Sequence, residues 1–169
     1  MHIRNSIAED LDTIFNFYDL AIAYQKKISD QHWLPFDPEL VKKEISENRQ
    51  WKIMVDGEVA CIFCVAYSDP LIWGEKDKDP SIYIHRIVTN PEFRGKNFVV
   101  EIINWALVFG KDSEKKYLRM DTWGDNARLR EYYVKCGFEF LGVIKPQNPE
   151  LLPAHYAEIS LSLFQINIV

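Results

Sequence analysis

The stretch NPEFRGKNFVVEIINWALVFG, residues Asn90–Gly110, joins a cationic loop to an apolar helical pattern. Its apolar residues recur in adjacent pairs every four positions, which predicts an amphipathic helix; they are Phe98, Val99, Ile102, Ile103, Ala106 and Leu107. Gly110 stands where such a helix usually ends. Arg94, Gly95 and Lys96 come just before the helix, where unpaired backbone N–H groups and the positive end of the helix dipole gather. The stretch therefore predicts an anion-binding site at a helix N-terminus.

Strand and helix patterns flank this stretch. SIYIHRIVTN, residues 81–90, is rich in β-branched and aromatic residues and predicts a strand that runs into the loop. KYLRMDTW, residues 116–123, predicts a strand after the helix, and residues 125–138 predict a further helix that Gly137 ends. A strand, a helix and a second strand in this order indicate a crossover connection within one sheet.

The N-terminal part also carries helix and strand signals. HIRNS is a candidate first strand, and Ser6 and Glu9 have the spacing of a capping box for the helix that follows. Asp37 and Pro38 stand at the cap and the first position of a second helix. This part therefore predicts one strand followed by two helices.

A hairpin and two late strands complete the element order. The hairpin over residues 51–69 turns at Asp56-Gly57, and residues 139–145 and 157–166 predict the last two strands. The segment WGEKDKDP is expected to be a charged loop. The order β-α-α-β-β-β-α-β-α-β-β predicts an α/β fold with a mixed sheet of about seven strands and helices on both faces. The 169 residues suit one domain, residues 1–169.

Composition and charge exclude several classes of protein. The formal net charge of −5 argues against nucleic acid as a partner and mildly favours a cationic substrate. The longest apolar run, Val59–Tyr67, is too short for a membrane helix, which needs about 20 residues. The N-terminus has no apolar signal region, so we expect a cytoplasmic protein without a membrane segment.

The cysteines and histidines give no metal or redox pattern. Cys61 and Cys64 lie in a strand-like run, where an odd separation puts their side chains on opposite faces. We therefore expect them to pack in the core. None of the four histidines has metal-ligand spacing, and no metal is predicted.

Two motifs in order, the RGKN loop and the helix DNARLREYYVKCGF, resemble the GNAT superfamily of acyl-CoA-dependent N-acyltransferases. The resemblance is densest from Ile82 to Phe138. In that family an R/Q-x-x-G-x-G/A loop holds the pyrophosphate of coenzyme A, and the strand before the loop pairs with the pantetheine arm. The resemblance implies the following cofactor-binding residues: Ile87, Val88, Thr89, Arg94, Gly95, Lys96, Asn97, Phe98, Val99 and Asn126.

The loop departs from the family pattern at two positions. Asn97 stands where the family prefers Gly, and Asn is the non-glycine residue that best tolerates a positive φ. Val99 stands where the family prefers Gly or Ala, and its branched side chain narrows the approach of the backbone to a phosphate. The alternative interpretation of the loop is a solvated basic turn before a core helix.

The resemblance also implies catalytic residues. Tyr133 matches the family tyrosine beside the sulfur, and the alternative is that it only packs beside Leu129 and Cys136. His85 stands nine residues before the loop arginine, where polyamine-type acetyltransferases carry a glutamate, and imidazole suits a general base at neutral pH. A structural role for His85, His155 as a rival base, and proton transfer through ordered water all stay open.

The resemblance implies acetyl-CoA as cosubstrate and an amine as acceptor, by direct attack in a ternary complex. In the family the acceptor contacts come from the connection between the first two helices and from the last loop. The predicted substrate-binding residues are Trp33, Phe36, Trp123, His155 and Tyr156. The alternatives are a degenerate acyl-CoA-binding regulatory module, and transfer of a longer acyl chain or to a hydroxyl. The oligomeric state is open, with a homodimer as one option.

Overall fold

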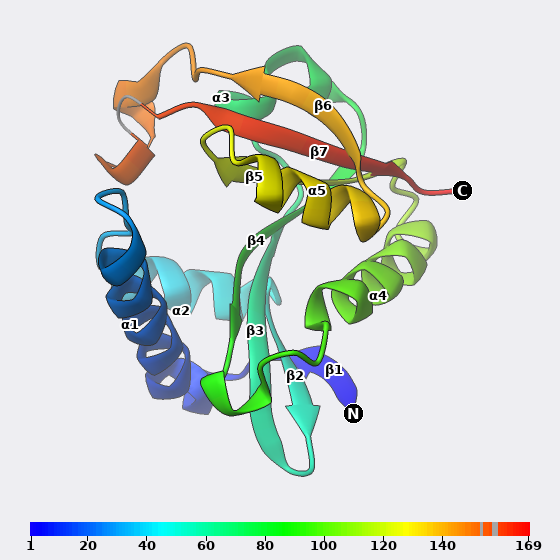
Figure 1. The fold of residues 1–169 in the computed structure, drawn as a ribbon. Helices are drawn as coiled ribbons and strands as arrows, with labels where there is room; N and C mark the ends of the chain where they lie inside the picture. Colours follow the sequence, from blue (N-terminus) through cyan, green and yellow to red (C-terminus); the bar gives the residue numbers. More distant parts are fainter. Residues whose placement is uncertain (153, 157–158) are drawn as a thin grey trace. The chain divides into compact units, whose positions relative to one another are not determined.

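The computed structural model describes residues 1–152, 154–156 and 159–169, with the backbone alone at His155. Its strands form a seven-stranded mixed sheet, hydrogen-bonded in the order β1-β2-β3-β4-β5-β7-β6 (Figure 1). Their bounds are β1 (His2–Asn5), β2 (Gln50–Val55), β3 (Glu58–Ala66), β4 (Ser81–Thr89), β5 (Tyr117–Trp123), β6 (Glu139–Ile144) and β7 (Leu161–Asn167). The predicted α/β fold with about seven strands is confirmed.

The chain divides into two compact units. Unit 1 comprises Met1–Val65 and Arg86–Phe98, and unit 2 comprises Ala66–His85 and Val99–Val169. The predicted single domain over residues 1–169 stays a prediction.

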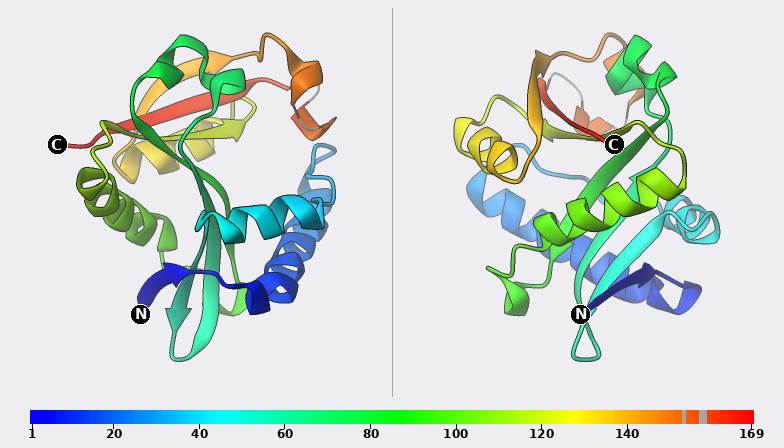
Figure 2. Two further views of the ribbon diagram at one scale, coloured as in Figure 1. Left: turned by 180° about the vertical axis from the view of Figure 1, so that it is seen from behind. Right: turned by 90° about the vertical axis from the view of Figure 1, so that its right-hand side faces the viewer.

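Unit 1 contains the N-terminal helices and the hairpin. Its helices are α1 (Leu11–Ile28) and α2 (Pro38–Ser46), with 3₁₀ turns η1 (Ala8–Asp10) and η3 (Pro91–Phe93). The Asp37 carboxylate accepts a hydrogen bond from the Glu39 N–H at 2.9 Å, so the predicted cap of α2 is confirmed. Asp56 and Gly57 both have positive φ, 51° and 88°, at the predicted turn of the β2–β3 hairpin (Figure 2).

The predicted capping box of the first helix is wrong. Asp10, not Glu9, accepts the hydrogen bond from the Ile7 N–H, at 2.7 Å, and Ser6 is buried. The reason is tertiary, because the Asp10 carboxylate also lies 2.5 Å from the ammonium of Lys52 on β2. This ion pair holds the helix start against the sheet.

The core of unit 1 lies where α1 and α2 pack against β3 and β4. Its buried members are Ile14, Phe17, Tyr18, Val41, Ile45, Ile62 and Val88. Cys61 and Cys64 are also buried in β3, and burial raises the pKa of these thiols to about 12 and about 11. The expected packing role of both cysteines is confirmed, and neither is a reactive thiolate.

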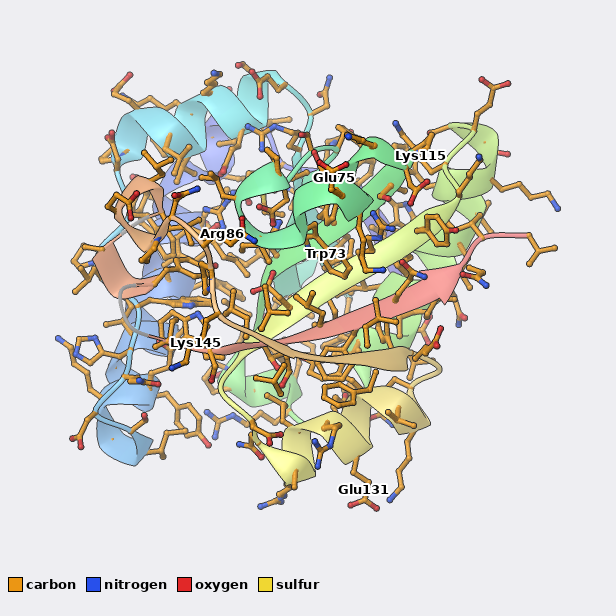
Figure 3. All side chains as sticks on the ribbon, turned by 90° about the horizontal axis from the view of Figure 1, so that it is seen from above. Trp73, Glu75, Arg86, Lys115, Glu131 and Lys145 are labelled. Atoms are coloured by element: carbon orange, nitrogen blue, oxygen red, sulfur yellow. The ribbon has the colours of Figure 1, made fainter. Side chains whose placement is uncertain are left out.

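Unit 2 contains the rest of the sheet and the C-terminal helices. Its elements include α3 (Pro70–Trp73), η2 (Gly74–Lys78), α5 (Ala127–Lys135), η4 (Pro149–Leu151) and η5 (Ala154–Tyr156), while α4 (Phe98–Asp112) starts on the last residue of unit 1. Figure 1 shows β5, β7 and β6 side by side, with α5 against them. Trp73 is labelled in Figure 3, and the guanidinium carbon of Arg119 lies over its ring, 4.9 Å from the ring centroid.

Two local predictions in unit 2 are wrong. The charged segment expected as a loop, residues 73–80, contains η2 and begins on the last residue of α3, Trp73, whose side chain is buried. Gly110 does not end α4, which continues to Asp112. A Cβ at Gly110 would lie 2.5 Å from Ile168 Cδ1, so this glycine serves close packing. Among the described residues, no helix is both long enough and apolar enough to cross a membrane.

Candidate functional site

The loop after β4 is anchored to its neighbouring strand. The Asn90 N–H donates to the Ala60 carbonyl at 2.9 Å, and the Asn90 side chain accepts from the Glu92 N–H at 3.1 Å. These contacts hold the start of the loop while Arg94, Gly95, Lys96 and Asn97 stay exposed.

The loop backbone has the conformation that glycine-rich loops need. Gly95 and Asn97 both have positive φ, 82° and 53°. Asn97 therefore has the positive φ that the sequence predicted it would tolerate, because asparagine adopts this conformation at low cost. The Arg94 guanidinium lies over the Tyr24 ring, 5.3 Å from its centroid, and α4 begins at Phe98. Val99 is the second residue of α4.

The predicted pantetheine strand, Ile87–Thr89, follows an irregular residue. Arg86 has φ 53°, unusual inside a strand, and its guanidinium is ion-paired with Glu44. The same guanidinium lies over the rings of Tyr18 and Phe36, at 5.5 and 5.1 Å. Sequence analysis missed Arg86, because neither its conformation nor its partners leave a local signal.

The predicted substrate residues of unit 1 are brought together. The rings of Trp33 and Phe36 are 5.6 Å apart, and the ring of Phe36 is 4.6 Å from that of Tyr18. All three side chains pack in or against the unit 1 core. They form an aromatic wall, and two of its rings, Tyr18 and Phe36, lie against the Arg86 guanidinium.

The predicted residues of α5 have clear local roles. The Asn126 side chain caps the helix by accepting from the Leu129 N–H at 3.1 Å. The Tyr133 ring packs near Phe138 and Phe164, at 6.1 and 5.4 Å between centroids. Burial, and then the neighbouring Tyr132 and Cys136, raise the pKa of Tyr133 above its usual range. Its phenol is therefore protonated at neutral pH.

Two predicted substrate residues of unit 2 also meet. The rings of Trp123 and Tyr156 are 5.9 Å apart in an edge-to-face arrangement. The side chain of His155, predicted both as a substrate residue and as the rival base, lies outside the described residues.

His85 lies between two carboxylates of unit 2. Its Nε2 is 3.6 Å from Asp69 Oδ2, and its Nδ1 is 3.9 Å from Asp121 Oδ1. β4 and β5 are parallel, with Tyr83 opposite Arg119. His85 and Asp121 are each two residues further on, so their side chains fall on one face of the sheet.

Both carboxylates are electrostatically unusual. Burial raises the pKa of Asp121 to about 7, and its side chain is only 4% exposed. Burial, and then the carboxylates of Asp121 and Asp77, raise the pKa of Asp69 to about 7. Asp69 Oδ2 and Asp121 Oδ1 have no hydrogen-bond partner among the described residues. Such groups are typical of functional sites.

The donor set of these three residues is one that cations accept. Ligand atoms of Asp69, His85 and Asp121 all lie within 4.8 Å of one another. The two carboxylates face different ring nitrogens, Nε2 for Asp69 and Nδ1 for Asp121. The same three groups can also share a proton.

Sequence reasoning found His85 but neither carboxylate. Asp69 follows the hairpin and Asp121 lies in a strand, and the two are far apart in the chain. Alternation along residues 116–123 could have put Asp121 on one face of its strand. Only the β4–β5 register puts that face beside His85.

The chain matches one family model and two curated relatives. The model of the Acetyltransferase (GNAT) family matches residues 16–138. The uncharacterized N-acetyltransferase YesJ of Bacillus subtilis is 31% identical over 74 residues, which cover 44% of this chain and 41% of that protein. An uncharacterized N-acetyltransferase of Methanocaldococcus jannaschii is 27% identical over 149 residues, which cover 85% of this chain and 62% of that protein. The chain thus spans less than two thirds of either relative.

Solved structures share the fold. A GNAT-family acetyltransferase from Listeria monocytogenes superposes with a TM-score of 0.78 at 19% identity, covering 98% of this chain and 94% of that one. The yncA protein of Salmonella typhimurium, solved with its cofactor acetyl-CoA, gives 0.69 at 12% identity, covering 99% and 94%. These likenesses show the fold alone. The family model spans more than half of the 169 residues, and the chain therefore belongs to the Acetyltransferase (GNAT) family.

Proposed function

We propose that the chain is an N-acetyltransferase that moves the acetyl group of acetyl-CoA to an amine by direct attack. Membership of the Acetyltransferase (GNAT) family is the observation that carries this proposal. Members of this family use acetyl-CoA, and the left-handed Gly95 and Asn97 give the loop a backbone suited to the coenzyme's pyrophosphate. The residues proposed to contact the coenzyme are Ile87–Thr89, Arg94–Val99 and Asn126.

The proposed reaction needs three events. The amine loses a proton, its nitrogen bonds to the thioester carbon, and the carbon–sulfur bond breaks. His85 is the proposed acceptor of the amine proton, directly or through one water. The protonated phenol of Tyr133 is the proposed donor to the departing thiolate, since burial favours its neutral form. The residues proposed to contact the acceptor amine are Trp33, Phe36, Trp123, His155 and Tyr156.

Thiol release from acetyl-CoA, measured against a panel of amines, tests the function, with isothermal titration of acetyl-CoA alongside. The proposal expects acetyl-CoA binding and amine-dependent release, with cationic amines preferred because the chain is acidic. Binding without release for any amine would favour the regulatory module, for which Val99 in the loop helix is the specific observation. Parallel assays with longer acyl-CoAs and with alcohols address the other alternative. Cytoplasmic localisation and a homodimer stay predictions.

Replacement of His85 tests the base. His85→Gln keeps a polar side chain and removes the imidazole, so the rate near neutral pH should fall while acetyl-CoA affinity holds. His155→Gln is the matched control for the rival base. A wild-type pH profile in both variants would assign the proton to water.

A further inference from the structure

The two nitrogens of His85 face two different carboxylate oxygens. Asp69 Oδ2 lies toward Nε2, and Asp121 Oδ1 lies toward Nδ1. Both oxygens lack a hydrogen-bond partner among the described residues, although both are buried. A neutral imidazole carries one N–H and can donate to only one of them. The arrangement therefore lacks a proton as long as the ring is neutral and both carboxylates are ionised.

Two protonation states supply that proton. In one, the imidazolium donates toward two carboxylates. In the other, a neutral ring points its N–H toward one carboxylate and its bare nitrogen toward the other group, which is a carboxylic acid. Both states have a net charge of −1, and both avoid an unpaired buried carboxylate, which is costly in a low-dielectric environment. The proton thus belongs to the three side chains together.

We propose that Asp69 and Asp121 are positioning residues for His85, which orient its ring from both sides and share a proton with it as one titrating unit. The coupling itself is independent of catalysis. Its catalytic role rests on the proposed function: the unit receives the proton that leaves the acceptor amine as the nitrogen–carbon bond forms and the carbon–sulfur bond breaks. His85 is the most exposed of the three side chains, at 21%, and is the point at which a proton enters.

The titratable groups around Asp69, His85 and Asp121 keep their own charge states. The Tyr83 ring stacks on His85 at 6.5 Å, and the Tyr83 hydroxyl donates to Asp77 at 2.6 Å. Burial would raise the pKa of Asp77, but hydrogen bonds from Tyr83, the Asp69 N–H and Ser68 lower it overall. Asp77 is therefore a fixed negative charge beside Asp69. The variable proton lies among Asp69, His85 and Asp121.

Nuclear magnetic resonance titration of the histidine imidazoles in the whole chain tests the unit without any assay of activity. His85→Gln assigns the His85 signals. In the wild type we expect the His85 curve to depart from a single-site titration. Asp69→Asn and Asp121→Asn should each move its midpoint to lower pH by about one unit or more, because a nearby carboxylate favours imidazolium. Asp125→Asn, an exposed carboxylate paired with Arg130, is the matched control and should leave the curve unchanged.

Single-site curves with the wild-type midpoint in both asparagine variants would overturn the proposal. Asp69 is more exposed than Asp121, so Asp69→Asn carries the test if the buried replacement does not fold. Calorimetric titration of Zn²⁺ and Mn²⁺ into the wild type should show no tight site. Tight binding that Asp69→Asn removes would also overturn the proposal, since an ion would then be the shared partner.

The catalytic role has a separate readout. The pH dependence of kcat should shift in Asp69→Asn in the same direction as the His85 midpoint, while KM for acetyl-CoA stays near the wild-type value. A shifted midpoint without any acetylation would leave the coupling standing and reject the proposed function. Acetylation with an unshifted pH profile in the variant would reject the positioning role.

Discussion

Gly95 and Asn97 both adopt the left-handed backbone conformation, on either side of Lys96. This conformation costs free energy for a residue with a side chain, and the cost is smaller for asparagine than for other non-glycine residues. Both residues lie in the loop immediately before α4, and Asn97 there adopts a conformation that glycine would adopt freely.

Replacement of Asn97 tests this conformation. Asn97→Gly should keep acetyl-CoA binding, whereas Asn97→Val should lower the free energy of unfolding by about 1–2 kcal/mol, the cost of a left-handed branched residue. Urea unfolding and isothermal titration measure the two effects. Loss of binding in a folded Asn97→Gly protein would reveal a side-chain role for Asn97.

Arg94→Ala tests whether the loop binds phosphate. We expect acetyl-CoA affinity to fall about tenfold, the scale of one charge-assisted hydrogen bond of about 1.5 kcal/mol. Isothermal titration measures it. Arg4→Ala removes an exposed arginine of β1 and controls for net charge. Equal affinity in the two variants would mean that the loop is not a phosphate site.

Tyr133→Phe separates proton donation from packing. The ring keeps its contacts with Phe138 and Phe164, so the melting temperature should hardly change. Turnover should fall by about 10²–10⁴, the usual cost of losing one acid, with little change in acetyl-CoA affinity. Tyr132→Phe is the neighbouring control. Full turnover in Tyr133→Phe would leave this residue with a packing role only.

The buried Asp121 predicts a pH dependence of stability. Its pKa is about 7 in the folded chain and about 3.9 in an unfolded one, so the folded state binds more protons between these values. The free energy of unfolding should therefore fall as pH rises from about 4 to about 7. Asp121→Asn should reduce that slope. Urea unfolding of both proteins at pH 5 and pH 8 measures it, and an unchanged slope would contradict the prediction.

Replacement of Gly110 should have two opposing effects on the free energy of unfolding. Alanine gains about 1 kcal/mol of helix propensity over glycine, but its Cβ forces the end of the Ile168 side chain to move. Gly110→Ala, whose Cβ also lies 3.1 Å from Ile82 Cδ1, should therefore be near neutral. Gly110→Val adds two further methyl groups at this crowded place and should cost about 1–3 kcal/mol. Ile168→Ala should relieve part of the valine cost in a double-mutant cycle. Additive effects in that cycle would mean that the two side chains do not meet.

Sequence alone predicted the features that depend on residues a few positions apart. The Asp37 cap, the Asp56-Gly57 turn and the left-handed Asn97 each follow from a side chain and its own backbone. The element order and the family motif on α5 were likewise readable, because hydrophobic periodicity and helix ends are local signals. These features suffice for the fold and for the predicted coenzyme loop.

The tertiary structure decided every feature that depends on register or close packing. Asp10 replaces Glu9 at the helix start because Lys52 lies opposite it. Gly110 stands inside its helix, where Ile168 leaves little room for a Cβ. Asp69 and Asp121 reach His85 only through the pairing of β4 with β5 and the fold of the segment before α3. No local pattern encodes such contacts, because a shift of one residue in strand register would turn Asp121 to the opposite face of the sheet.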